Sequence, residues 1–160
     1  MSDKVKFHFS GPEESPGYLL AQLTILWQRN QKKVLDPLEL THTQFVILSS
    51  IAWLSSIHTT ITQVEIARFN NYDRMMVSKV LRTLQTKKLI ERKEHATDTR
   101  AKIVNLTSKG SQILQKAIVQ VENADIDFFS SLGSNLPNLN KSMKKLIEAH
   151  RSDNSELENE

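Results

Sequence analysis

The sequence predicts a mainly α fold, a winged helix-turn-helix with long N- and C-terminal dimerisation helices. A short helix and a basic amphipathic helix, expected over about 62–69 and 73–84, are separated by an Asn-rich turn, which is the helix-turn-helix pattern. Two short segments directly after them, 89–93 and 102–106, predict the strands of a wing. Apolar stripes in the segments before and after this unit predict further helices, whose apolar sides the small winged unit cannot cover.

The first helix is expected over about 16–34. Ser15 and Pro16 are typical of a helix cap and first turn, and leucines then recur at helical spacing. Pro37 should end this helix, because proline cannot continue the backbone hydrogen-bond ladder. The preceding residues, 1–15, finish in a stretch with Gly and Pro and predict a flexible arm.

Capping boxes, in which S/T-x-x-E/Q spacing satisfies the first amides of a helix, predict two further helix starts. The box at 41–44 opens a helix over about 42–56, whose wide apolar stripe indicates burial on most sides. The box at 62–65 opens the short helix of the helix-turn-helix. Between them, the β-branched segment 59–61 predicts one edge strand.

Asp73 is expected to cap the basic helix, which has two chemically different sides. At about 100° per residue, one side carries the apolar residues Val77, Val80, Leu81 and Leu84 and should pack on the domain. The opposite side offers donors, positive charges and an apolar group, which suit base edges, phosphates and thymine methyls. An ordinary solvated surface has the same amphipathic pattern. The turn and the wing beside this helix favour DNA contact.

Two helices are expected after the wing. Thr107 caps a long helix that reaches about Ser131 and ends at Gly133, and its apolar residues follow the spacing of an inter-helix seam. A last helix spans about 136–150. The apolar stripes of the terminal helices predict packing against a second chain, with packing inside one chain as the alternative.

These elements predict four regions along the chain. They are a flexible N-terminal arm at 1–15, a helical dimerisation region at 16–40 and 108–150, a winged helix-turn-helix lobe at 41–107, and a disordered acidic tail at 151–160.

Composition limits the function classes. The chain has 160 residues and no cysteine, which excludes disulfides, thiolate metal sites and cysteine nucleophiles. No apolar run approaches the ~20 residues of a membrane helix, and the N-terminus lacks a signal-peptide stretch, so we expect a cytoplasmic protein without a membrane partner. Between residues 60 and 110, eleven Lys and Arg face five Asp and Glu, as a phosphate-binding surface requires.

Together these motifs resemble the MarR family of bacterial transcriptional regulators. The matching segments are 66–67, 73–84, 89–92, 98–102 and 106–110, where the wing signature D-T-R-A is followed by L-T-S-K-G. The resemblance covers about residues 16–148. It departs from the family near Lys88, where glycine is frequent, so the end of the basic helix is expected to differ in shape.

The resemblance implies a sequence-specific DNA-binding regulator, commonly a repressor, that binds pseudo-palindromic double-stranded DNA as a homodimer. In such proteins, small ligands, often aromatic anions, bind between the dimerisation region and the DNA-binding lobe and reduce DNA affinity. The wing aspartate orients its arginine, and these two map onto Asp98 and Arg100. The chain is then a nucleoid-associated protein, not an enzyme, and needs no cofactor.

The candidate DNA-binding residues lie on the two helices and the wing. They are Thr62, Gln63, Arg74, Met75, Ser78, Lys79, Arg82, Arg92, Lys93, Asp98, Thr99 and Arg100. A candidate effector pocket contains Trp27, His42 and Phe45. The plainer alternatives are that His42 is a half-buried residue at a helix start, and that the aromatic side chains of Tyr18, Trp27 and Trp53 fill core.

The sequence contains no motif for a catalytic or metal site. The sequence has no nucleophile elbow, no clustered metal ligands and no phosphate-cradling glycine loop, so neither a hydrolase nor a metal site is expected. The rival to DNA binding is a winged-helix protein-interaction module without DNA readout. The DNA-binding hypothesis is favoured by Ser78, Lys79, Arg82 and Arg100 together, because such a module would present an apolar or acidic helix surface instead.

Overall fold

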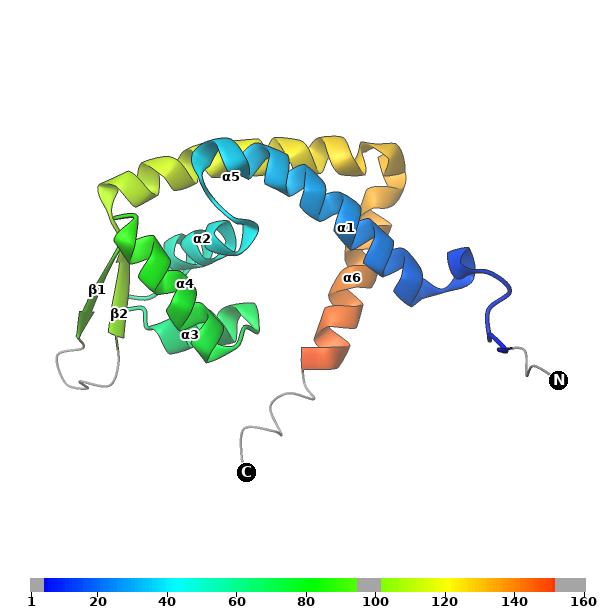
Figure 1. Cartoon of the computed structure of the whole chain (residues 1–160), viewed down its shortest axis with the longest axis horizontal. Helices are drawn as coiled ribbons and strands as arrows, with labels where there is room; N and C mark the ends of the chain where they lie inside the picture. Colours follow the sequence, from blue (N-terminus) through cyan, green and yellow to red (C-terminus); the bar gives the residue numbers. More distant parts are fainter. Residues whose placement is uncertain (1–4, 95–101, 152–160) are drawn as a thin grey trace, which may run out of the picture. The chain divides into compact units, whose positions relative to one another are not determined.

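The computed structural model describes residues 5–94 and 102–151 (Figure 1). The described chain is mainly helical and has one antiparallel pair of strands. Its elements are η1 (Pro12–Glu14), α1 (Pro16–Leu35), η2 (Asp36–Leu38), α2 (His42–Ile57), α3 (Gln63–Asn70), α4 (Arg74–Thr86), β1 (Ile90–Glu94), β2 (Lys102–Leu106), α5 (Ser108–Phe129), η3 (Ser130–Asn135) and α6 (Leu136–Arg151). The chain divides into two compact units, residues 1–124 and 125–160.

Helix α2 lies at the centre of the first unit. It packs against α1, α3, α4 and β2, and its Ile47, Leu48 and Ile51 are fully buried. The neighbouring elements complete this core with Leu35, Ile66, Val77, Leu81, Leu84, Ile90 and Val104. Each such side chain contributes about 1.5–3 kcal/mol on burial. The core therefore fixes how α3, α4 and the two strands lie around α2.

The predicted helix starts are confirmed by their caps. Thr41 and Thr62 each accept a hydrogen bond from the third amide of the following helix, and both capping boxes are complete. The Asp73 carboxylate accepts from the amide of Met76 at 2.8 Å and so begins α4. Thr107 Oγ1 accepts from the amide of Gly110 at 2.9 Å at the start of α5.

Three helical segments end on a residue in the left-handed conformation: Glu39 (φ 55°), Asn71 (φ 53°) and Lys88 (φ 60°). Lys88 shows the pattern. Its amide donates to the carbonyl of Gln85 at 2.9 Å, and the amide of Leu89 donates to that of Leu84 at 3.0 Å. These two bonds form a Schellman motif, which satisfies the last carbonyls of α4. The motif also turns the chain directly into β1.

The base of the hairpin is held against the start of α5. Strand pairing runs from Ile90 opposite Leu106 to Glu94 opposite Lys102. The carbonyl of Leu89 accepts a hydrogen bond from the amide of Thr107 (3.0 Å), and a Cβ at Gly110 would lie only 2.9 Å from the carbonyl carbon of Leu89. Glycine at 110 therefore lets α5 approach the hairpin closely.

One predicted element was wrong, and the end of a predicted helix differs slightly from the expected position. Residues 59–61 do not form a strand; Thr62 makes an isolated bridge to Ile103 instead. Helix α5 ends at Phe129, and Gly133 (φ 49°) lies in a following 3-10 segment. The predicted acidic tail lies outside the described residues.

The aromatic residues expected to fill core do not all do so. Trp53 on α2 is 61% exposed, and Tyr18 on α1 is 46% exposed. Trp53 faces away from the core because Ile51 and Leu54 occupy the buried side of the same turn. Burial of α2 is thus less complete than its apolar stripe predicts.

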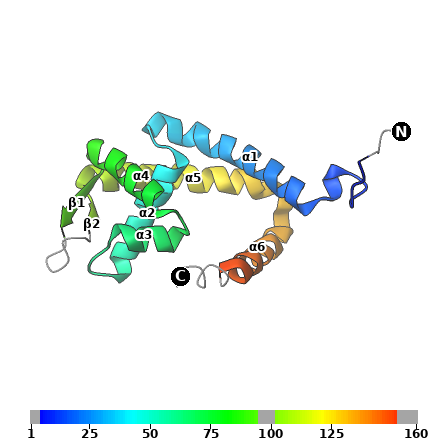
Figure 2. The same ribbon diagram turned by 60° about the horizontal axis from the view of Figure 1, so that its bottom comes forward.

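The terminal helices present apolar side chains that this single chain leaves exposed. On α1 these are Leu19, Leu20, Leu23, Ile25 and Leu26, and on α6 they are Met143, Leu146 and Ile147. The C-terminal half of α1 runs beside α5, where Asn30 Nδ2 donates to the carbonyl of Ala124 at 3.1 Å (Figure 2). None of the helices in the described ranges is both long and apolar enough to cross a membrane.

Candidate nucleic-acid interface

Helix α4 presents a polar side to solvent, opposite the buried Val77, Leu81 and Leu84. Met75 is 81% exposed, and Arg82 is exposed as well. The Arg82 guanidinium donates to Ser78 Oγ, one turn earlier, at 3.3 Å. This bond directs the arginine along the helix surface, with its remaining donors available to a ligand.

The start of α3 and the polar side of α4 enclose a shallow hollow of about 280 Å³. It is lined by Gln63, Arg74, Met75, Ser78 and Arg82. All five are candidate DNA-binding residues from the sequence, and the structure brings them together from two helices. The hollow offers an amide, a hydroxyl, an apolar contact and two guanidinium groups, which is a set of groups suited to base edges and phosphates.

Arg92 on β1 joins the wing to this hollow. Its guanidinium donates to Gln63 Oε1 at 3.0 Å. Burial lowers the pKa of Arg92, and the nearby charge of Arg82 lowers it further. Its Nε is buried and makes no hydrogen bond within the described part of the chain. The sequence could not reveal the pairing with Gln63, because the two residues lie 29 positions apart on different elements.

The other candidates are more dispersed. Thr62 is engaged in its capping box and in the bridge to Ile103. Lys79 is exposed on α4, and Lys93 on β1 forms an ion pair with Glu91 at 3.5 Å. The predicted wing-tip residues Asp98, Thr99 and Arg100 lie outside the described residues.

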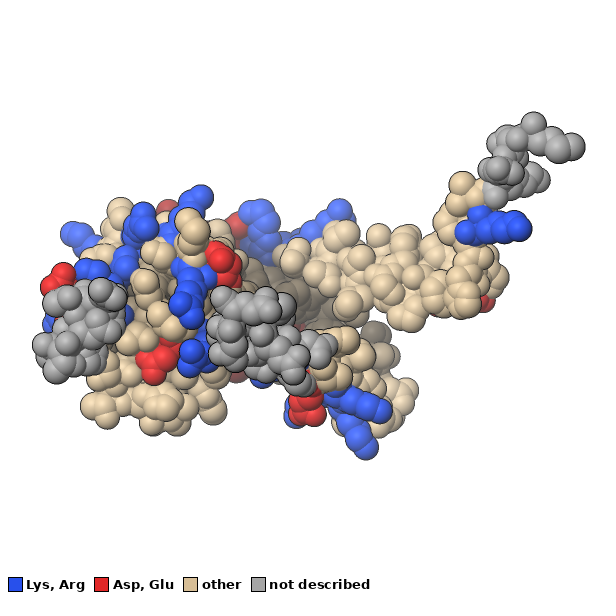
Figure 3. Space-filling model, turned by 90° about the horizontal axis from the view of Figure 1, so that it is seen from below, with Lys and Arg blue, Asp and Glu red and all other residues tan. Residues whose placement is uncertain are grey.

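Positive side chains gather on one face of the first unit. Figure 3 shows lysine and arginine over the left part of the molecule, where α3, α4 and the strands lie, with few acidic residues between them. The lysines and arginines of α3, α4, β1 and β2 are Arg68, Arg74, Lys79, Arg82, Arg92, Lys93 and Lys102. A surface of this charge attracts the phosphate backbone of nucleic acids.

Comparisons with known proteins place this geometry in a family. Residues 36–125 match the family model of the ArnR1-like winged-helix domain. The chain is 42% identical over 123 residues to YdcH of Bacillus subtilis (strain 168), an uncharacterized HTH-type transcriptional regulator, covering 77% of this chain and 84% of YdcH. It also resembles a MarR mutant from E. coli in complex with operator DNA, at 26% identity and a TM-score of 0.74, covering 81% of this chain and 91% of that one. The chain belongs to the MarR family.

A further solved relative of similar fold is MepR of S. aureus in complex with DNA. The TM-score is 0.75 at 24% identity, with 84% of this chain and 98% of MepR covered. The predicted fold class and the resemblance to MarR regulators are thus confirmed. This chain is a DNA-binding winged-helix transcription regulator of the MarR type.

The departure of this MarR-family chain at Lys88 has a structural outcome. Lys88 keeps the left-handed backbone (φ 60°) that a glycine would adopt there without cost. Lys88 therefore carries a conformational cost that glycine at this position would not have.

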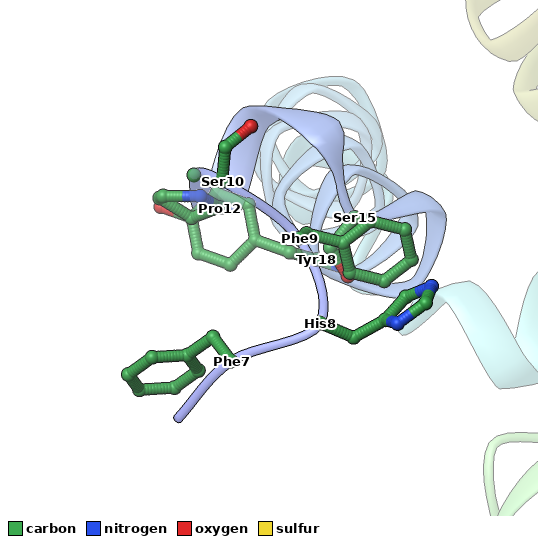
Figure 4. A pocket seen from close by; sticks show the side chains of 8 residues that line it. Phe7, His8, Phe9, Ser10, Pro12, Ser15 and Tyr18 are labelled. Carbon is green, nitrogen blue, oxygen red and sulfur yellow. The ribbon is translucent and has the colours of Figure 1, made fainter. Parts of the chain in front are cut away.

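The candidate effector residues form a cluster between α1 and α2. The rings of Trp27 and His42 meet edge to face at 4.8 Å between centroids, and those of His42 and Phe45 are 6.5 Å apart. A different, mostly apolar hollow of about 450 Å³ lies at the N-terminal arm and is lined by residues 7–12, Ser15 and Tyr18. There Phe7 and His8 point to opposite sides of the arm (Figure 4). Within the described ranges, no three His, Asp or Glu side chains gather as metal ligands.

Proposed function

We propose that this MarR-family chain is a sequence-specific repressor that reads double-stranded DNA with α4 and the wing. The observation that carries the proposal is the hollow at the junction of α3 and α4, where Arg74, Ser78 and Arg82 lie beside Gln63 and Arg92. These groups come from three elements that the core holds in place, so they present one surface to a major groove. The E. coli MarR relative was crystallised with operator DNA, which supports this assignment.

The individual roles follow from side-chain chemistry. Arg82, at the middle of the polar side, would contact a base edge, and Met75 would contact a thymine methyl. Thr62, Lys79 and Lys93 would contact phosphates and so set the register on the duplex. On the family resemblance, Arg100 would enter the minor groove, oriented by Asp98, with Thr99 beside them.

The proposed working form is a homodimer. The exposed apolar side chains of α1 and α6, in residues 16–40 and 108–150, supply the interface, since monomers rarely leave such stripes in water. Two-fold symmetry would then place two α4 helices on a pseudo-palindrome with half-sites about 10 bp apart. Light scattering at micromolar concentration should give twice the chain mass of 18.3 kDa. A species of 18.3 kDa alone would contradict the dimer.

Arg82→Ala tests the DNA-reading side. If Arg82 reads a base, the change should weaken cognate binding by ~1–3 kcal/mol and relax the preference at one position. Lys116→Ala, which removes an exposed charge from α5, is the matched control and should leave the preference intact. Fluorescence anisotropy on cognate and scrambled duplexes over a salt series measures both the affinity for the cognate duplex and the preference for it. A wild-type protein whose binding has no salt dependence would instead support the protein-interaction module.

We also propose that a small aromatic acid releases the DNA by binding at Trp27, His42 and Phe45. A flat anion could stack on these rings, and His42 can carry the compensating charge. Release requires that the ligand bind the DNA-free state more tightly than the DNA-bound state. A panel of phenolic acids should quench Trp27 fluorescence, measured in a Trp53→Phe variant, and lower DNA affinity together. Quenching that survives His42→Ala and Phe45→Ala unchanged would remove this pocket from the proposal.

A further inference from the structure

The C-cap residue of α4 is hydrogen-bonded to the beginning of α2. The half-buried Lys87, at the C-cap of α4, donates through Nζ to the carbonyl of Glu39 and to Gln44 Oε1, the latter at 3.2 Å. These acceptors lie 48 and 43 residues earlier in the chain. A single ammonium group thus connects the end of the proposed DNA-reading helix to the η2–α2 turn.

Gln44 is well placed to hold this connection. The residue is only 8% exposed, and its Oε1 also accepts from the amide of Thr41 at 3.3 Å. The same oxygen therefore closes the capping box of α2 and accepts from Lys87. Because burial restricts the amide and the capping bond orients it, the acceptor is preorganised for the ammonium.

The end of α4 is also hydrogen-bonded to the start of α5. The carbonyl of Lys87 accepts from Lys109 Nζ at 3.2 Å, and the carbonyl of Lys88 accepts from Thr107 Oγ1 at 2.8 Å. The end of α4 is therefore held between the first turn of α2 and the first turn of α5. Loss of the Lys87 ammonium would release one of these two sides and leave the other.

We propose that Lys87 is a positioning residue for DNA recognition, which sets the pose of α4 by fixing its C-terminal end to Gln44 and Glu39. The proposal rests on the proposed function, because it assumes that α4 reads the bases. Gln44 lies between His42 and Phe45 on the same turn of α2, so the residue that receives Lys87 adjoins the aromatic cluster. A ligand there would displace the Lys87 acceptor and, with it, the end of α4.

The test compares Lys87→Met with Lys88→Met. Both variants lose one positive charge from neighbouring positions, but only the first loses the ammonium that binds Gln44. The measured quantity is the ratio of affinities for a selected cognate duplex and a scrambled duplex, by anisotropy over a salt series. A positioning role predicts that Lys87→Met lowers this ratio about tenfold, the loss expected for one charged hydrogen bond, with binding to the scrambled duplex matching that of Lys88→Met. Lys87→Arg, which keeps the donors, should restore most of the ratio.

Equal ratios in wild type and Lys87→Met would overturn the proposal. So would a loss of equal size on both duplexes, since that result describes a phosphate contact. If Lys87→Met does not fold, Gln44→Asn is measured instead. It withdraws the acceptor by one methylene, and an unchanged ratio there overturns the proposal equally.

Hydrogen exchange separates this proposal from the proposed function. In Lys87→Met, amides at the end of α4 and in the first turn of α2 should exchange faster together, while those of α3 should not change. A wild-type protein with no preferred duplex would overturn the proposed function and the role of Lys87 in it. A wild-type preference with unchanged exchange and ratio in Lys87→Met would overturn the role of Lys87 alone.

Discussion

Replacing Lys88 by glycine should stabilise the protein. Lys88 holds φ at 60° in the Schellman motif that ends α4. A side chain with a Cβ costs ~1–2 kcal/mol in this region, whereas glycine adopts it freely. Glycine also loses more entropy on folding, by about 0.4–1 kcal/mol. The expected net gain for Lys88→Gly is therefore about 0.5–1 kcal/mol, or roughly 1–4 °C in Tm for a chain of this length.

Lys88→Ala separates the backbone effect from the loss of the side chain. It removes the same exposed charge but keeps the Cβ and its conformational cost. Urea unfolding of the three proteins at constant protein concentration gives the differences, with equal m-values as the check on a two-state comparison. The glycine variant should be more stable than both the alanine variant and the wild type. A glycine variant no more stable than the alanine variant would refute this account of the helix end.

Two further changes test the local structure. Gly110→Ala should destabilise by ~1–3 kcal/mol, because the new Cβ collides with the backbone of Leu89. Gly17→Ala is its control and should not lower the Tm, since the added Cβ has no atom within 4 Å beyond its chain neighbours and the backbone of its own helix. Asp73→Ala should cost about 0.5–2 kcal/mol by removing the cap of α4, and Asp73→Ser should recover most of that loss in urea unfolding. Equal stability of Gly110→Ala and Gly17→Ala, or of Asp73→Ala and wild type, would contradict these assignments.

Helix starts could be predicted from the sequence because their signals are local. The capping boxes at 41–44 and 62–65 and the carboxylate of Asp73 act within three residues, and each begins a helix as expected. Asn71 is similar, since asparagine tolerates the left-handed turn that it occupies. Glu39 and Lys88 adopt the same backbone without any such preference, because the buried residues after them require it. No local pattern could show those two turns.

The site was predictable only in part. The amphipathic pattern of α4 indicates which side is exposed, so Met75, Ser78 and Arg82 could be selected before their positions were known. The pairings of Arg92 with Gln63 and of Lys87 with Gln44 join residues 29 and 43 positions apart, and such contacts depend on how the elements pack. Trp53 shows the opposite error, because its apolar character alone predicts burial.

The most direct measurement of the central claim is selection of bound duplexes from a random library by the full-length protein, followed by sequencing. The account predicts enrichment of a pseudo-palindrome with half-site centres about 10 bp apart. Anisotropy on the enriched duplex should then show a steep salt dependence and a clear preference over a scrambled duplex of the same length. A bound pool whose composition matches the starting library would contradict the claim that this chain reads DNA sequence.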